Sequence, residues 1–359
     1  MDITALEKNY GDFYAPVAKV LIKGKDLIIQ GIEVTSVTVD NTLEGADQFS
    51  FVVNNAFDIA DRRLLWLDEY FKMGNRVEIK MGYLDKLKPL LVGLITNVKA
   101  DFPSSGMPQI TVSGYDLSYR MMKNRRSLQN DDSKDSDIVQ QMAAQYGLKV
   151  AGVEGTELKL PRVEQNQETD FQFLTRLARH NGFEFFVFQD SLYFQKSSSN
   201  KSADITLEWG KGLVSFSPEV NLAKQVKKVE LYGWDSKAKK PIVGSAGVGD
   251  EPGREDSRAS GGELLQAVVG GDAVHRERLP VFSQQEADRR ARAKLKKASE
   301  DLLKGRGESI GIPEILADKN IELKGLGKQF SRTYYIEKTQ HTVSAAGYKT
   351  TFDVKETTV

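Results

Sequence analysis

Alternation of apolar and polar residues is the pattern that most constrains the fold of this chain. Apolar side chains occupy every second position within residues 49–53 and 77–81. Successive side chains of a strand point to opposite faces, so this period of two predicts half-buried β-strands. Turn-forming residues at 23–25, 74–75 and 103–106 separate the strands at spacings that favour an antiparallel barrel or sandwich.

Helical spacing replaces this alternation in the next part of the chain. Apolar residues recur at helical intervals over residues 136–146. A second helix is predicted to begin at Thr169, where Gln172 completes a capping box, and to end near residues 181–182. An aromatic-rich hairpin at residues 183–195 follows, so this part is predicted to be a small mixed α/β domain.

The last part returns to strands, with one long interruption. Alternation predicts strands within residues 205–234 and again within residues 321–354. Between them, residues 244–271 contain eight glycines and little periodicity, which predicts a long mobile loop. In the first part of the chain, residues 61–71 are expected to add one short helix.

A strongly amphipathic helix is expected after the glycine-rich segment. Ser283 and Glu286 form a capping box at its start, and Gly305 lies where a C-terminal cap belongs. One face is basic, and its members are Arg289, Arg290, Arg292, Lys294, Lys296 and Lys297. Acidic residues and alanines surround them, so we expect a solvated or subunit-facing surface.

Two segments repeat a short motif. Residues 110–116 and 229–235 both end a predicted strand with glycine, an aromatic residue and aspartate. Duplication of one β module explains this repeat, and so does chance in a chain rich in strands.

Composition excludes several classes of function. The chain has no cysteine, which excludes disulfides, thiolate metal sites and cysteine nucleophiles. Its 50 Lys and Arg balance 50 Asp and Glu, so the formal net charge is zero and no nucleic-acid partner is expected. No stretch approaches the roughly 18 consecutive apolar residues of a membrane span.

The chain shows no motif of catalysis, metal binding or cofactor binding. His180, His275 and His341 are each isolated, and no phosphate-binding loop or dinucleotide fingerprint occurs. The acidic run at residues 131–137 lacks the glycine and glutamate of a calcium loop and fits a linker before a helix. The sequence does not exclude a pair of carboxylates for glycoside hydrolysis, because such a pair needs only proximity in space. We therefore expect no catalytic residues, no metal and no cofactor.

Four groups of motifs occur in an order that matches a known family. They lie in residues 71–117, 165–182, 216–235 and 325–350. Their order resembles the phage late control D family, the baseplate hub proteins of contractile tails and contractile injection systems, which is related to the N-terminal hub part of type VI secretion spike proteins. The matching positions taken as structural motif residues are Gly82, Tyr83, Gly114, Tyr115, Asp116, Asp170, Gly233, Trp234, Asp235, Tyr335, Gly347 and Tyr348.

The resemblance implies an α+β, mainly β fold. Two tube-like antiparallel β-barrels are expected, with the small mixed α/β domain between them. The expected boundaries are residues 1–125 for the first barrel, 126–200 for the middle domain and 201–359 for the second barrel. A long loop and a helix, residues 236–309, are expected to be inserted in the second barrel.

The resemblance also implies a structural function. A hub of this kind forms a homotrimeric ring that adapts a threefold spike to a hexameric inner tube. Its expected partners are two sister copies, a separate spike protein, inner tube proteins and other baseplate proteins, without nucleic acid and without a direct membrane span. Because many relatives continue into a spike and this sequence stops after the second barrel, either the spike is expected to be a separate chain or this chain is a truncated form.

Assembly in the cytoplasm and a final place in a phage tail or injection-particle baseplate are expected from the same resemblance. The sequence leaves open whether the parent machine is a phage, a bacteriocin or an injection particle. The alternative function is a spike-associated cell-wall hydrolase.

Overall fold

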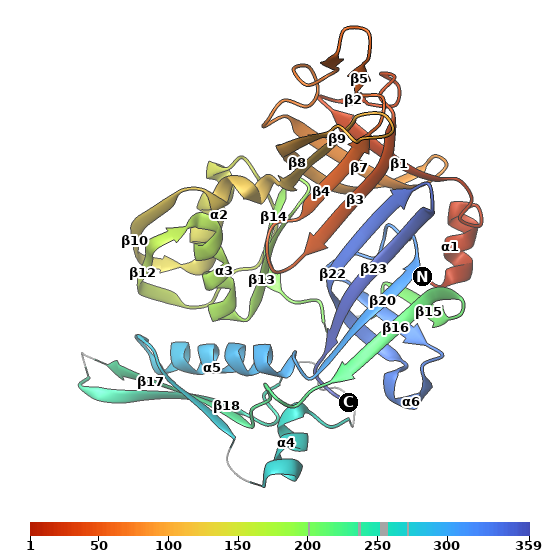
Figure 1. The fold of residues 1–359 in the computed structure, drawn as a ribbon. Coiled ribbons are helices and arrows are strands. Elements are labelled where there is room, and N and C mark those ends of the chain that lie inside the picture. Colours follow the sequence, from red (N-terminus) through yellow and green to blue (C-terminus); the bar gives the residue numbers. More distant parts are fainter. Residues whose placement is uncertain (200–201, 236–237, 252–257, 271–272) are drawn as a thin grey trace.

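The computed structural model describes residues 1–199, 202–235, 238–251, 258–270 and 273–359. Strands predominate in these residues, and most of the longer helices lie in the middle part and beneath it (Figure 1). In this part of the chain, no helix is both long and apolar enough to cross a membrane.

The N-terminal part is an open antiparallel sheet. The order of its six main strands is β1 (Pro16–Ile22), β7 (Arg76–Tyr83), β8 (Lys86–Asp101), β9 (Gln109–Asp116), β4 (Gln48–Val53) and β3 (Val34–Thr42). The short strands β2 (Lys25–Asp26), β5 (Phe57–Asp58) and β6 (Arg63–Leu64) lie at its margin. A helix that the sequence did not predict, α1 (Ile3–Tyr10), precedes the sheet and begins at Asp2, whose side chain accepts from the Ala5 amide at 2.9 Å.

The C-terminal part is a closed barrel of six strands. In order around the barrel they are β15 (Ile205–Trp209), β16 (Gly212–Val220), β20 (Leu303–Ile310), β23 (Gly347–Glu356), β22 (Arg332–Ser344) and β21 (Asn320–Lys324). The barrel is mixed, because β15 runs parallel to both of its neighbours while the other pairs are antiparallel. The short helix α6 (Gly327–Phe330) links β21 to β22.

Strand β22 joins the open sheet to the barrel. Its first residues pair with β21, and residues 338–343 pair with β3 of the N-terminal sheet. The expectation of two barrels is therefore met for one module only. In the described residues β1 and β3 do not pair with each other, since the free edge of β3 is taken by β22, and the N-terminal sheet stays open.

One hydrophobic core runs through both β-rich parts. Phe51 and Ile79 of the open sheet belong to the same buried cluster as Leu207 and Phe352 of the barrel. Burial of large apolar side chains is the main favourable term in folding, so the two parts stabilise each other.

The middle part is the predicted mixed α/β unit. It follows the 3₁₀ helix η1 (Leu117–Met122) and contains β10 (Arg125–Lys134), α2 (Asp135–Gln145), β11 (Lys149–Val153), β12 (Lys159–Thr169), α3 (Asp170–Asn181), β13 (Phe183–Phe188) and β14 (Ser191–Lys196). The predicted capping box is present, with Thr169 accepting from the Gln172 amide and Gln172 accepting from the Thr169 amide. The acidic run is not a free linker, because most of it extends β10 and Asp135 begins α2.

A separate unit is inserted between β16 and β20. It contains β17 (Lys228–Asp235), β18 (Lys240–Gly247), α4 (Gly261–Val269), β19 (Val274–Arg278) and α5 (Gln284–Ser299). The three strands form their own sheet, and α5 covers one face of it through Ala291 and Leu295 (Figure 1). The prediction that residues 226–234 belong to the second barrel is therefore wrong, because alternation does not distinguish one half-buried sheet from another.

Three local expectations also differ from the structure. Residues 61–71 form turns and β6 instead of a helix, and their continuous run of apolar residues lacks helical amphipathicity. Gly305 lies in β20, where a side chain would meet the Phe216 ring, and α5 ends earlier, at Ser299. The glycine-rich segment includes β18 and a capped α4, while residues 252–257 and 271 of it lie outside the described residues.

His341 of β22 is fully buried and neutral. Its Nε2 donates to the Ile315 carbonyl at 2.9 Å, and its Nδ1 accepts from the Tyr348 hydroxyl at 2.9 Å and faces the Thr350 hydroxyl at 3.1 Å. Burial lowers the pKa of His341 from its usual 6.5 to about 4. The unfolded chain therefore binds more protons than the folded chain between these values, so stability falls as the pH drops through this window.

We predict that substitution of His341 by glutamine flattens this pH dependence. His341→Gln keeps a donor and an acceptor but cannot titrate. Between the two pKa values, the slope of the unfolding free energy against pH should therefore be smaller by about 1.4 kcal/mol per pH unit than in the wild type. Urea denaturation in buffers from pH 4 to 7 measures it. The wild-type chain in the same buffers is the reference, and an unchanged slope in His341→Gln would contradict the assignment.

Gly114 allows β8 and β9 to approach closely. A methyl group built on Gly114 would lie 1.9 Å from the Leu94 carbonyl oxygen and 2.9 Å from the Phe49 ring. We predict that Gly114→Ala lowers the free energy of unfolding by about 2 kcal/mol, because the sheet must deform to admit the methyl group. Gly155→Ala, with nothing within 4 Å, should leave the urea midpoint nearly unchanged. Equal midpoints for the two variants would argue against close packing at Gly114.

Candidate functional site

Two motif residues meet where the open sheet joins the barrel. Tyr83 of β7 and Tyr348 of β23 are buried, with ring centroids 5.6 Å apart. The Tyr83 hydroxyl donates to the Gly311 carbonyl at 2.9 Å, and the Tyr348 hydroxyl bonds to His341. The pair therefore ties the two β-rich parts together, although 264 residues of sequence separate its members.

Asp116 ends β9 and begins η1. Its carboxylate accepts from the Ser118 amide at 2.8 Å and from the Asp47 amide at 3.0 Å. Burial raises the pKa of Asp116 to about 6. Burial and the nearby Asp116 carboxylate also raise the pKa of Asp47 well above its usual range. These contacts fix the point at which the sheet passes into the middle part.

Asp170, the first residue of α3, organises the middle part. Its fully buried carboxylate accepts hydrogen bonds from Arg126 of β10, Tyr146 at the C-terminal cap of α2 and Gln165 of β12. The Arg126 Nε and Gln165 Nε2 atoms each lie 2.9 Å from it. A buried carboxylate with this many donors is a structural tie, since removal of one partner leaves the other buried groups unpaired.

Tyr335 ties the barrel to the end of the middle part. Its hydroxyl donates to Asp318 at 2.8 Å. The Asp318 carboxylate also accepts from the Ser198 amide at 3.1 Å and the Gln195 side chain at 2.9 Å. The middle part is thus anchored to the barrel at its exit.

Other motif residues shape strands and turns. Gly82 lies at φ +159°, where a side chain would meet the Lys86 carbonyl, and Gly347 adopts a positive φ of 101° in the β22–β23 turn. Tyr115 stacks on Tyr119 with centroids 5.2 Å apart.

The second copy of the repeated motif lies in the insert. Gly233 packs against Val281, Asp235 accepts from the Ala238 amide at 2.9 Å, and Trp234 is 59% exposed. The first copy ends a strand of the open sheet, so the two copies do not occupy equivalent positions in two barrels.

Large apolar side chains are exposed on the closed barrel. Trp209 at the end of β15 is 63% exposed, and Val214 on the neighbouring β16 is 56% exposed. Gly212 and Leu213 of β16 pair with β15 at this point, which places both side chains on adjacent strands. Aromatic side chains exposed on an otherwise packed module are typical of contact surfaces.

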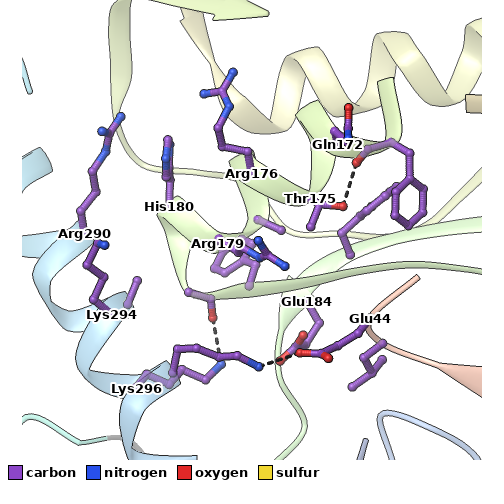
Figure 2. A pocket seen from close by; sticks show the side chains of 18 of the residues that line it. Glu44, Gln172, Thr175, Arg176, Arg179, His180, Glu184, Arg290, Lys294 and Lys296 are labelled. Carbon is purple, nitrogen blue, oxygen red and sulfur yellow. Dashed lines mark hydrogen bonds and ion pairs between the residues drawn. The ribbon is translucent and has the colours of Figure 1, made fainter. Parts of the chain in front are cut away.

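A cleft of about 1230 Å³ lies between the middle part and α5 of the insert. Its walls come from the end of β12 with α3, the start of β13, and α5. Residues 43–45 after β3, Arg125, residues 277 and 279, and Glu337 and Lys355 of the barrel complete them. Lys296 reaches from α5 to the Gly182 carbonyl at 2.9 Å, at the start of the strand that carries Glu184 (Figure 2). Arg289 donates to the Asn181 side chain at 2.7 Å, so α5 is held against the end of α3.

The basic face of α5 lines this cleft in part. Arg290, Lys294, Lys296 and Lys297 all belong to its wall, so the face points toward the middle part of the same chain. His180 at the end of α3 lies beside them, and burial, followed by the charge of Arg290, lowers its pKa to about 3. A neutral His180 does not act as the cationic cap that its position near the helix end suggests.

The described residues contain no group of three or more His, Asp or Glu arranged to hold a metal ion. His275 is exposed in β19 and lies 3.3 Å from Glu277, and His341 is used within the barrel. The three histidines thus lie in different parts of the structure. The cleft was not predicted from the sequence, because no sequence motif links the elements that form its walls. The basic face of α5 was the one sequence feature that pointed to it.

A comparison with curated proteins finds no match. Solved structures with the same fold include the 43 kDa tail protein of prophage MuSo2 from Shewanella oneidensis, at 15% identity and a TM-score of 0.71, over 95% of this chain and 98% of that one. A tail protein from Neisseria meningitidis MC58 aligns at 14% identity and a TM-score of 0.68, over 96% and 97% of the two chains.

The E. coli c3393 protein, a component of the type VI secretion system, aligns at 12% identity and a TM-score of 0.57, over 94% of this chain and 76% of that one. The chain thus has the fold of phage tail proteins. Residues 15–345 match the family model of the Alg8 N-terminal domain, and the chain belongs to that family.

Proposed function

We propose that the chain is a structural hub of the baseplate in a phage tail or contractile injection system, and that it is not an enzyme. The observation that carries the proposal is the pairing of β3 with β22, which makes the open sheet and the closed barrel one continuous body. The likeness to tail proteins over 95% of the chain supports it. The order of late control D motifs supports the same class of protein.

In this proposal three copies form a ring with two tube-like modules from each copy. The closed barrel is one module, and the N-terminal sheet is the other, completed in the ring. An open sheet exposes unpaired backbone groups at its edge, and neighbouring copies cover such edges in a closed assembly. The division at residues 1–125, 126–200 and 201–359 then separates the two ring modules from the middle unit.

The proposed ring adapts a threefold spike, made by a separate protein, to a hexameric inner tube. Other baseplate proteins would contact its outer parts, and its final place would be the baseplate of the particle. Neither nucleic acid nor a membrane span enters this function, since the formal net charge is zero and recognition by shape suffices.

Contacts between copies are assigned to the exposed apolar surface of the barrel. Trp209 and Val214 present bulky apolar groups on adjacent strands of a module that the proposal places in the ring. Buried tryptophans are frequent energetic centres of interfaces, where truncation costs about 2 kcal/mol or more.

We predict that the purified chain has the mass of a trimer at micromolar concentration and that Trp209→Asp shifts it to the monomer. Burial of the new charge would be costly in the interface and harmless in the free barrel. Light scattering after size exclusion measures the mass. The matched control is Trp234→Asp, a similarly exposed tryptophan on the insert, which should stay trimeric. A monomeric wild-type chain would refute the ring.

We also predict that the chain does not cleave cell walls. Purified peptidoglycan mixed with the protein should keep its turbidity, while lysozyme under the same conditions clears it. Clearing by the chain that survives further purification would favour the spike-associated hydrolase instead.

A further inference from the structure

The cleft between the middle part and α5 has an excess of positive charge. Its lining includes eight Arg or Lys side chains and six Glu side chains, in a chain whose formal net charge is zero. Its volume of about 1230 Å³ exceeds that of most small-molecule pockets, which hold roughly 300–1,000 Å³. A cleft of this size accommodates a segment of polymer.

The lining carboxylates are already neutralised. Glu168 pairs with Arg176 at 2.8 Å, and Glu44 pairs with Lys297 at 3.0 Å. The further pairs are Glu277 with Lys294, and Glu300 and Glu337 with Lys355. The remaining lining carboxyl, Glu184, has a pKa raised by burial. Five of the six lining acids are therefore already paired with cations of the cleft.

Two lining arginines lack a carboxylate partner in the described part of the cleft. Arg179 is exposed on α3 and makes no ion pair within the described residues, and Arg125 donates only to the Gln167 carbonyl, at 3.0 Å. These guanidinium groups offer planar pairs of donors that match carboxylates.

A free strand edge faces the same cleft. Phe183, Glu184 and Phe185 of β13 all line it, although their side chains alternate between the two faces of the sheet. Consecutive residues of a strand can all line one cleft when the edge of the strand, rather than one face of its sheet, points toward the cleft. Strand β13 is the outer strand of its sheet and pairs only with β14 among the described strands. Its outward backbone groups are therefore available to an added strand.

We propose that the cleft binds an extended acidic segment of a partner protein, which pairs with the edge of β13 while its carboxylates meet Arg125 and Arg179. An edge strand selects a polypeptide, because only a peptide backbone continues a β ladder. This inference does not depend on the proposed ring, since every wall of the cleft comes from one chain.

The test uses the full chain and a fluorescein-labelled peptide in which glutamate alternates with valine. Fluorescence anisotropy should show binding that weakens as salt is added, because the pairs lie near solvent. Arg179→Glu should weaken binding about tenfold or more, since it replaces attraction by repulsion. The matched control is Arg162→Glu, an exposed arginine of β12 outside the cleft, which should bind as the wild type does.

Hydrogen exchange locates the peptide. Amides of β13 (residues 183–188) should exchange more slowly with the peptide bound, while those of β18, an outer strand with no residue in the wall of the cleft, should not change. Unaltered exchange in β13, equal affinity of Arg179→Glu and wild type, or equal weakening by Arg162→Glu would each overturn the proposal. Single-stranded DNA of equal charge that binds as tightly as the peptide would overturn it as well.

Discussion

The pairing of β3 with β22 is the constraint on which the rest of the structure depends. Residues 37–42 of the open sheet and 338–343 of the barrel share one ladder of backbone hydrogen bonds. Without this ladder, the N-terminal sheet would end in an exposed edge beside the barrel, and the common core of both parts would be open to water. The contact of Tyr83 with Tyr348 and Gly311 closes the same junction on its other side.

A rigid junction also determines where the other two units lie. The middle part leaves the sheet at Asp116 and returns to the barrel near Asp318, so it is fixed at both ends. The insert leaves and re-enters the barrel between β16 and β20. Two units anchored to one body in this way face each other across a defined gap, and the cleft along α3 and α5 is the result.

Local signals in the sequence predicted many elements and few of their connections. The capping box of Thr169 and Gln172 fixes the start of α3 within a single turn, so it was visible without tertiary information. The pairing of β3 with β22 joins segments about 300 residues apart, and alternation specifies which face of a strand is buried but not which strand lies next to it. For the same reason β17 was assigned to the barrel, although it belongs to the insert.

Charge was the property for which composition was least informative. A formal net charge of zero predicts no long-range attraction of polyanions. This argument holds only far from the protein, where the fields of all its charges add together. At the scale of one cleft, folding places the basic face of α5 opposite Arg176 and Arg179 of α3 and lowers the pKa of the intervening His180. The neutral total therefore conceals a local positive field, which only the packing of α3 against α5 creates.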